Sequence, residues 1–170
     1  MIIINLLKWS NWFSYGINNY IKFDSNYLTQ IKGLNGSGKS SIPLIIEETL
    51  YGKNSKSIKK QDLLNRLYPK EKLFSEIQFT KYNDKYLVQL SRKAILTLKL
   101  LKNGKDISSH TTTNTYNTIE KVIGLDFKTF TQLIYQSSTS SLQFLQSTDT
   151  QRKLFLINLF NLEKYTKLHD

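Results

Sequence analysis

The stretch IKGLNGSGKSS, which starts at Ile31, constrains the fold of this chain more than any other feature. Within it, Gly33, Gly38, Lys39 and Ser40 have the spacing G-x-x-x-x-G-K-[ST], which is typical of loops that bind nucleotide phosphates. Such a loop requires an apolar strand before it and a helix after it, and the sequence predicts both. The alternative, a glycine-rich linker beside a helix cap, explains the spacing less well.

The residue types suit this chemistry. Glycine lets the backbone adopt positive φ and approach a phosphate closely. Successive backbone N–H groups then point at the anion, and the N-terminus of the following helix adds to the attraction. In such loops the lysine, here Lys39, reaches the β- and γ-phosphates, and the hydroxyl of Ser40 can bind Mg²⁺.

Three strands are expected before the helix: residues 1–8, 20–23 and 27–32. Their apolar and β-branched residues favour extended backbone. The helix itself should run from near Gly38 to Leu50 and end at Gly52. Pro43 would lie about five residues into this helix, so we expect a slight local distortion.

The remainder of the chain predicts a hairpin meander and then helices. Strands are expected at 73–79, 86–92 and 95–102, with turns at Asn83-Asp84 and Asn103-Gly104. Helices are expected at 61–67, 116–123 and 126–133, and from Thr148 or Asp149 onward, with a threonine-rich loop at 111–115. This order indicates a mixed α/β domain and not a regular βαβ repeat.

Composition narrows the function. The formal net charge of +11 suggests an anionic partner, although lysines are spread along the whole chain. The chain has no cysteine, and His110 and His169 lack companions for a metal site. No apolar run reaches the roughly 18 residues of a membrane span, and the N-terminus lacks a signal-peptide pattern. We therefore expect a soluble intracellular protein.

ATP hydrolysis needs more than this loop. A metal-organising aspartate usually follows an apolar strand, and a further group positions the attacking water. The only apolar run that ends in aspartate is Val122-Ile-Gly-Leu-Asp126, and Gly124 interrupts it between helix-like segments. Asp126 is better interpreted as a helix cap.

Several segments resemble a known family. LLKWSNWFSYG, IKGLNGSGKSS and ETLYGKNSKSIKKQDLLNR are similar to the N-terminal ATPase lobe of SMC-like repair proteins. More narrowly, they resemble the ATPase subunit of SbcC-type double-strand-break nuclease complexes, and among these the phage recombination-endonuclease subunit. IEKVIGLDFKTFTQLIYQSS and LQFLQSTDTQRKLFLINLFNLEKY continue the resemblance almost to the end of the chain.

The resemblance implies a fold and a site. The fold would be a P-loop NTPase, the N-terminal lobe of an ABC-type ATPase head with a mixed sheet and an antiparallel β-meander. Residues 1–147 would form the lobe, and 148–170 would be a helix leading toward a coiled coil. ATP and Mg²⁺ would be the cofactors, and Gln136 would be the Q-loop residue that touches Mg²⁺ and the attacking water. The nucleotide would contact Gly33, Asn35, Gly36, Ser37, Gly38, Lys39, Ser40 and Ser41.

The chain also departs from the family pattern. Many members have an arginine near the nucleotide in the loop after the first strand, where this chain has Phe13, with Lys8 the nearest basic residue. The family's second half supplies the acidic pair of the Walker B motif, a signature serine and a switch histidine, and none is present here. We therefore expect this chain to bind ATP without completing its hydrolysis.

The resulting hypothesis is the ATP-binding half of an SMC-like ATPase that regulates a nuclease in DNA double-strand-break repair. Its expected partners are the C-terminal lobe, a second head, a metallophosphoesterase-type nuclease subunit and DNA, in the cytoplasm of the host if a phage encodes it. One alternative is a stand-alone small P-loop kinase or NTPase. Another is a DNA-binding module that uses the basic residues Lys53, Lys56, Lys59, Lys60 and Arg66.

Overall fold

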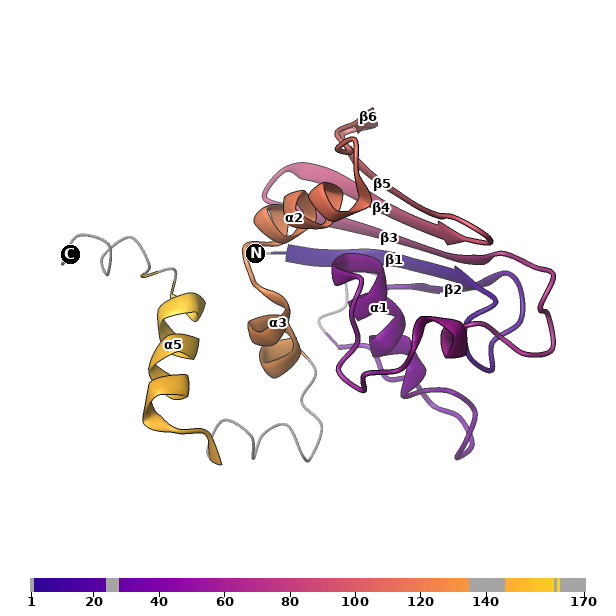
Figure 1. Ribbon diagram of the computed structural model, residues 1–170, viewed down its shortest axis with the longest axis horizontal. Coiled ribbons are helices and arrows are strands. Elements are labelled where there is room, and N and C mark those ends of the chain that lie inside the picture. The colour runs from indigo at the N-terminus through magenta and orange to yellow at the C-terminus, as the bar shows by residue number, and fades with distance from the viewer. Residues whose placement is uncertain (1, 24–27, 135–145, 161, 163–170) are drawn as a thin grey trace. The chain divides into compact units, whose positions relative to one another are not determined.

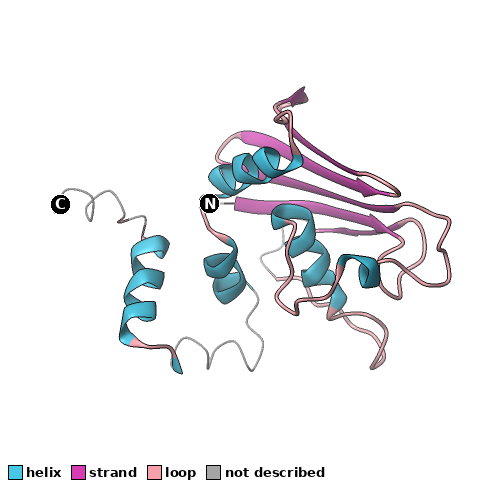
Figure 2. Cartoon of the chain, in the orientation of Figure 1, coloured by secondary structure: helices cyan, strands magenta, loops and turns pink. Residues whose placement is uncertain are grey.

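The computed structural model describes residues 2–23, 28–134, 146–160 and 162 of the 170-residue chain. These residues belong to two compact units, 1–119 and 120–170. Figures 1 and 2 show the helices and strands of each unit.

The first unit is built on one six-stranded sheet with the order β2-β1-β3-β4-β5-β6, in which all neighbouring strands are antiparallel (Figure 1). The strands are β1 (Ile2–Ser10), β2 (Asn19–Lys22), β3 (Leu73–Lys81), β4 (Asp84–Arg92), β5 (Leu96–Lys102) and β6 (Lys105–Asp106). The predicted hairpin meander is confirmed, and its strands end within a few residues of the expected bounds.

The core lies between this sheet and helix α1 (Ser41–Tyr51), which packs on β3 and β4. A row of four residues crosses the sheet in register, and each is fully buried: Leu7, Ile77, Val88 and Leu100. Ile45 of α1 is also fully buried. Because strand side chains alternate between faces, this row commits one face of the sheet to the core.

The opposite face of the sheet carries a polar cluster around Glu76. Glu76 of β3 accepts hydrogen bonds from Gln78 at 2.9 Å and from Gln89 at 2.7 Å, and the ammonium of Lys8 lies 3.3 Å from its carboxylate. Burial raises the pKa of Glu76, but these hydrogen bonds and the charge of Lys8 outweigh it and hold the pKa below its usual value.

The strand expected at 27–32 is not formed among its described residues. Residues 28–34 have no regular structure, and Leu28 and Leu34 are 86% and 84% exposed. A strand needs a neighbour for its backbone N–H and C=O groups, and none of the six strands pairs with this segment. The residue types of this segment predicted an extended backbone, but they did not specify a partner strand.

Helix α1 begins at Ser41 and not at Gly38, which places Pro43 in its first turn. The first N–H groups of a helix have no partner within the helix, so proline there removes no hydrogen bond. The reason for the expected distortion is therefore absent. The helix ends as predicted at Gly52, which has φ 64° and donates its N–H to Glu48 O at 3.0 Å.

Two predicted segments differ in the structure. The helix expected at 61–67 is a short 3₁₀ turn, Lys60–Leu63. The loop expected at 111–115 is wrong, because α2 (Thr112–Ile123) begins there. The hydroxyl of Thr111 accepts the N–H of Asn114 at 3.2 Å, so the threonine run caps the helix instead of interrupting it.

The second unit contains α3 (Phe127–Ile134) and α5 (Asp149–Leu159), and the caps of both helices are as predicted. Asp126 accepts the N–H of Thr129 at 2.8 Å, and Thr148 accepts the N–H of Gln151 at 3.4 Å. Among the described residues, no helix combines the length and apolar character that a membrane crossing requires.

Candidate phosphate-binding site

The glycine-rich loop lies directly before α1, and its backbone has the conformation that its glycines permit. Gly36 has φ 81° and Gly38 has φ 91°, both in the left-handed region. A Cβ on Gly38 would lie 2.9 Å from the Ser14 hydroxyl and 3.1 Å from the ring of Tyr15. Gly38 is thus required twice, for its φ and for this close approach.

Several backbone N–H groups of the loop remain available to a ligand. Ser37 N donates to Leu34 O at 3.2 Å, and Ser41 N donates to Gly38 O at 2.8 Å. Four neighbouring N–H groups have no acceptor among the described residues: those of Gly36, Gly38, Lys39 and Ser40. A run of unpaired N–H groups at a helix N-terminus attracts an anion.

Lys39 folds back onto its own loop. Its ammonium donates to the carbonyls of Gly33 at 2.7 Å and Leu34 at 2.6 Å, and it forms no ion pair among the described residues. Neutral carbonyls are weaker partners than phosphate oxygens, because hydrogen bonds between two charged groups are the stronger ones. The ammonium is therefore free to turn to a phosphate that enters the loop.

Ser40 occupies the N-cap position of α1, yet its side chain makes no capping hydrogen bond. Its hydroxyl is exposed and remains available as a metal ligand. Of the other predicted contact residues, Asn35 and Ser37 are exposed and Ser41 is partly exposed.

The remaining predicted site residue, Gln136, lies outside the described residues. Within the described ranges, no three histidine, cysteine, aspartate or glutamate side chains form a group that could hold a metal ion. Asp126 serves as the cap of α3. Of the two predicted metal ligands, Ser40 is the one that lies within the described residues.

The turn after β1 forms a wall beside the loop, which sequence reasoning had not predicted. Phe13 donates its N–H to Leu63 O at 2.8 Å. The next two residues, Ser14 and Tyr15, are the ones that approach Gly38. The sequence indicated only that Gly38 needs a glycine. Tyr15 and Ser14 lie 23 and 24 positions before it, so only the fold shows that they are its neighbours.

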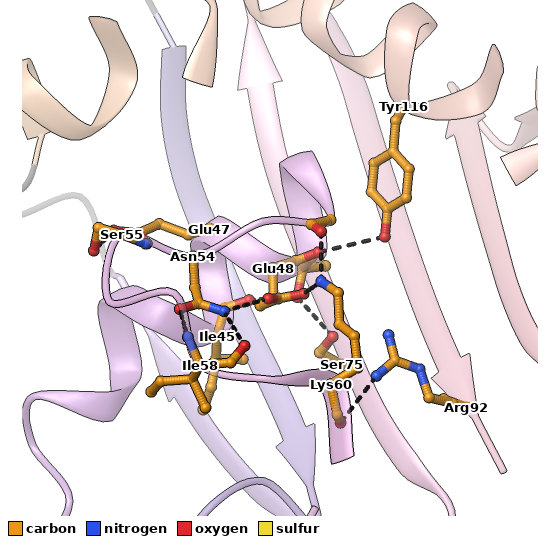
Figure 3. Close-up of polar contacts among 12 residues, drawn as sticks. Ile45, Glu47, Glu48, Asn54, Ser55, Ile58, Lys60, Ser75, Arg92 and Tyr116 are labelled. Carbon is orange, nitrogen blue, oxygen red and sulfur yellow. Dashed lines mark hydrogen bonds and ion pairs between the residues drawn. The ribbon is translucent and has the colours of Figure 1, made fainter. Parts of the chain in front are cut away.

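Two adjacent glutamates of α1 are buried and bind the segment that follows the helix (Figure 3). Glu47 accepts the N–H of Ser55 at 2.6 Å and its hydroxyl at 3.1 Å. Glu48 accepts a hydrogen bond from Asn54 at 2.6 Å and pairs with Lys60. Burial raises the pKa of Glu47, although the Ser55 hydrogen bonds act in the opposite direction.

These contacts hold a basic loop, residues 53–60, against the C-terminal half of α1. Lys60 is turned inward to Glu48, and Arg66, which follows the loop, lies 3.9 Å from Asp62. Three exposed lysines form no ion pair among the described residues: Lys53, Lys56 and Lys59. The basic loop therefore presents unpaired positive charge to solvent.

Comparison with known proteins identifies one family. The model of a family described as the AAA domain matches residues 7–170 of this chain. A probable exonuclease subunit 2 of Escherichia phage T5 is 48% identical over 169 residues, which are 99% of this chain and 28% of that protein. A DNA double-strand break repair Rad50 ATPase of Methanococcus maripaludis is 29% identical over 99% of this chain and 17% of its own length.

A solved structure supports the fold. A chain from structural work on ATP-driven dimerization and DNA-stimulated activation of SMC ATPases has a TM-score of 0.64 at 19% identity. The match covers 92% of this chain and 98% of that one. The predicted ATPase-head fold is confirmed, although the described strands pair only antiparallel and do not form the expected mixed sheet. The chain spans less than a third of the length of the two curated relatives it matches here.

Proposed function

This chain belongs to the AAA domain family, and we propose that it is the ATP-binding half of an ATPase head whose nucleotide state regulates a nuclease. The resemblance to the N-terminal ATPase lobe of SbcC-type, SMC-like repair ATPases, including the phage endonuclease subunit, is confirmed by the relatives. Membership of this family implies nucleotide binding.

The observation that best supports the site is that several hydrogen-bonding groups of the loop at residues 33–41 lack strong partners. It has unpaired N–H groups, an ammonium with only carbonyl partners, and an unused hydroxyl at Ser40. These groups match the needs of a triphosphate: hydrogen-bond donors, a cation, and a ligand for the accompanying Mg²⁺. We assign ATP contact to all the predicted loop residues, with Lys39 on the terminal phosphates.

Hydrolysis is proposed to require protein beyond this segment. No acidic group suited to Mg²⁺ forms among the described residues, and the role of Gln136 as a water-positioning residue stays a prediction. ATP shared between two heads would favour the closed dimer, because a ligand shifts an equilibrium only through its greater affinity for one state. A metallophosphoesterase-type nuclease subunit is the proposed partner that senses this closure.

The test is nucleotide binding by the purified chain, measured by calorimetry with MgATP. We expect binding by the unaltered chain, loss of binding in Lys39→Ala, and retention in Lys32→Ala. Lys32 is the matched control, because it is exposed in the segment leading to the loop and forms no ion pair with any described residue. Equal affinity of both variants would exclude the proposed role of Lys39. Steady hydrolysis by this chain alone, abolished in Lys39→Ala, would contradict the shared site.

The basic loop favours a second, compatible function, which is contact with the DNA backbone. Its lysines at 53, 56 and 59 are exposed and unpaired, whereas Glu47 and Glu48 beside it are buried and bound. Log affinity falls as log salt concentration rises, and each phosphate contact makes the slope of this fall steeper by about 0.9. Reversal of the three charges to glutamate should weaken DNA binding and flatten that slope. Reversal of Lys85, Lys105 and Lys121, which are exposed elsewhere, is the control.

A further inference from the structure

Two side chains of the wall that carry hydroxyl groups, Ser14 and Tyr15, lie close to Gly38 of the glycine-rich loop. Ser14 Oγ lies 2.9 Å from the place where a Cβ of Gly38 would be, and two ring carbons of Tyr15, Cε2 and Cζ, lie at 3.1 and 3.2 Å. The ring carbon Cζ bears the tyrosine hydroxyl. Both side chains therefore lie close to Gly38, whose backbone N–H has no acceptor among the described residues.

Neither hydroxyl has a partner in the described parts of the chain. Ser14 is exposed, so its hydroxyl is open to solvent, and Tyr15 is partly buried. Burial raises the pKa of Tyr15, which keeps its hydroxyl protonated and able to donate. Two donors without a protein acceptor, beside four unpaired N–H groups, extend the same anion-attracting surface.

The wall is held in place by contacts that do not involve these hydroxyls. Tyr15 N donates to Trp12 O at 2.8 Å, and the side chain of Asn65 donates to Tyr15 O at 3.0 Å. The Trp9 ring meets the Tyr15 ring edge-on, with centroids 5.1 Å apart. Trp12 itself is fully buried and donates its ring N–H to Phe74 O at 2.8 Å. The wall is thus preorganised, which lowers the entropic cost of a hydrogen bond to a ligand.

We propose that Ser14 and Tyr15 are phosphate-binding residues of the nucleotide site, each donating a hydroxyl hydrogen bond to the phosphate chain held by the loop. This inference rests on the proposed ATP site and adds two side chains from a distant turn to it.

The experiment measures affinity for two probes, MgATP and inorganic tripolyphosphate, by calorimetry. Tyr15→Phe removes only the hydroxyl and keeps the ring against Gly38, and Ser14→Ala removes the other donor. The matched control is Tyr20→Phe, because Tyr20 is exposed on β2. Each wall variant should weaken binding of both probes by the same factor, roughly tenfold, because it loses one hydrogen bond to a charged group. The control should bind as the unaltered chain does.

The outcomes separate this inference from the function on which it rests. If Lys39→Ala abolishes binding while both wall variants bind normally, the wall assignment is wrong and the ATP site stands. If the variants lose affinity for MgATP but not for tripolyphosphate, the hydroxyls face the nucleoside, and the phosphate assignment is overturned. If the unaltered chain binds neither probe, both proposals fail. The thermal midpoint of each variant without ligand should match that of the unaltered chain, since no protein hydrogen bond is lost.

Discussion

Gly36 and Gly38 offer a matched pair for measuring how closely the loop is packed against the wall. Both have positive φ, at 81° and 91°. A Cβ on Gly36 would meet nothing within 4 Å, whereas a Cβ on Gly38 would meet the Ser14 hydroxyl at 2.9 Å and the Tyr15 ring at 3.1 Å. Alanine at either site takes on the left-handed strain, and only alanine at Gly38 adds an overlap.

The expected magnitudes follow from these two terms. Left-handed backbone costs a non-glycine residue roughly 1–2 kcal/mol, which is the full expectation for Gly36→Ala. Overpacking against a held ring adds about 1–3 kcal/mol in Gly38→Ala. In a chain of this size, 1 kcal/mol lowers the thermal midpoint by about 2–4 °C. We therefore expect Gly38→Ala to melt several degrees below Gly36→Ala.

Tryptophan fluorescence during heating is the appropriate assay. The chain has two tryptophans, Trp9 and Trp12, and both are buried in the first unit, so the signal reports the unit that contains the loop. Equal midpoints for the two glycine variants would refute the close approach of the wall. So would a Gly38→Ala midpoint that is unchanged from the unaltered chain. Partial recovery in a Gly38→Ala, Ser14→Gly double variant would identify the shortest contact as the cause.

Three further predictions concern the polar groups around α1. Lys60→Met should lower the unfolding free energy by about 1–3 kcal/mol in urea denaturation, because it leaves the buried Glu48 without its cation. Lys59→Met is the control and should leave the unfolding free energy unchanged. Because the pKa of Glu47 is raised in the folded state, ionisation of this carboxyl opposes folding. The contribution of Glu47 to the unfolding free energy is therefore present at low pH and declines as the pH rises above the ordinary pKa of 4.5. In Glu47→Gln this decline should vanish, and identical pH–stability curves for the two proteins would contradict the shift. Ser40→Ala should weaken Mg²⁺-dependent ATP binding and leave the thermal midpoint unchanged, because the Ser40 side chain makes no capping hydrogen bond. Loss of a working N-cap usually costs about 1 kcal/mol, so a lower midpoint would show that Ser40 does cap α1.

The glycine-rich loop and the meander were predictable because they depend on contacts that are local in sequence. Positive φ at Gly36 and Gly38, the helix end at Gly52 and the turn at Asn103-Gly104 all follow from the conformational freedom of a few consecutive residues. Caps such as Asp126 are equally local. For the same reason, the spacing of the loop leads to the proposal of a phosphate site without any knowledge of the sheet.

The strand expected at 27–32 shows where such reasoning fails. The residue types predict an extended backbone, but a strand exists only when a second segment takes up its hydrogen bonds. None of the strands in the sheet does so. Helix α1 raises a similar problem, since Glu47 and Glu48 have the sequence pattern of surface residues. Their burial depends on Ser55, Asn54 and Lys60 folding back onto the helix.

The sequence by itself determined the local chemistry of this protein: a loop able to turn around an anion, a lysine beside it, and the family to which the chain belongs. Only the tertiary structure decided what surrounds that loop, including the approach of Ser14 and Tyr15 to Gly38 and the inward turn of Lys60. The physical reason is the sequence separation of the residues that interact. Backbone conformation depends on neighbours along the chain, whereas close packing and paired buried charges depend on segments that meet only when the sheet and helix have formed.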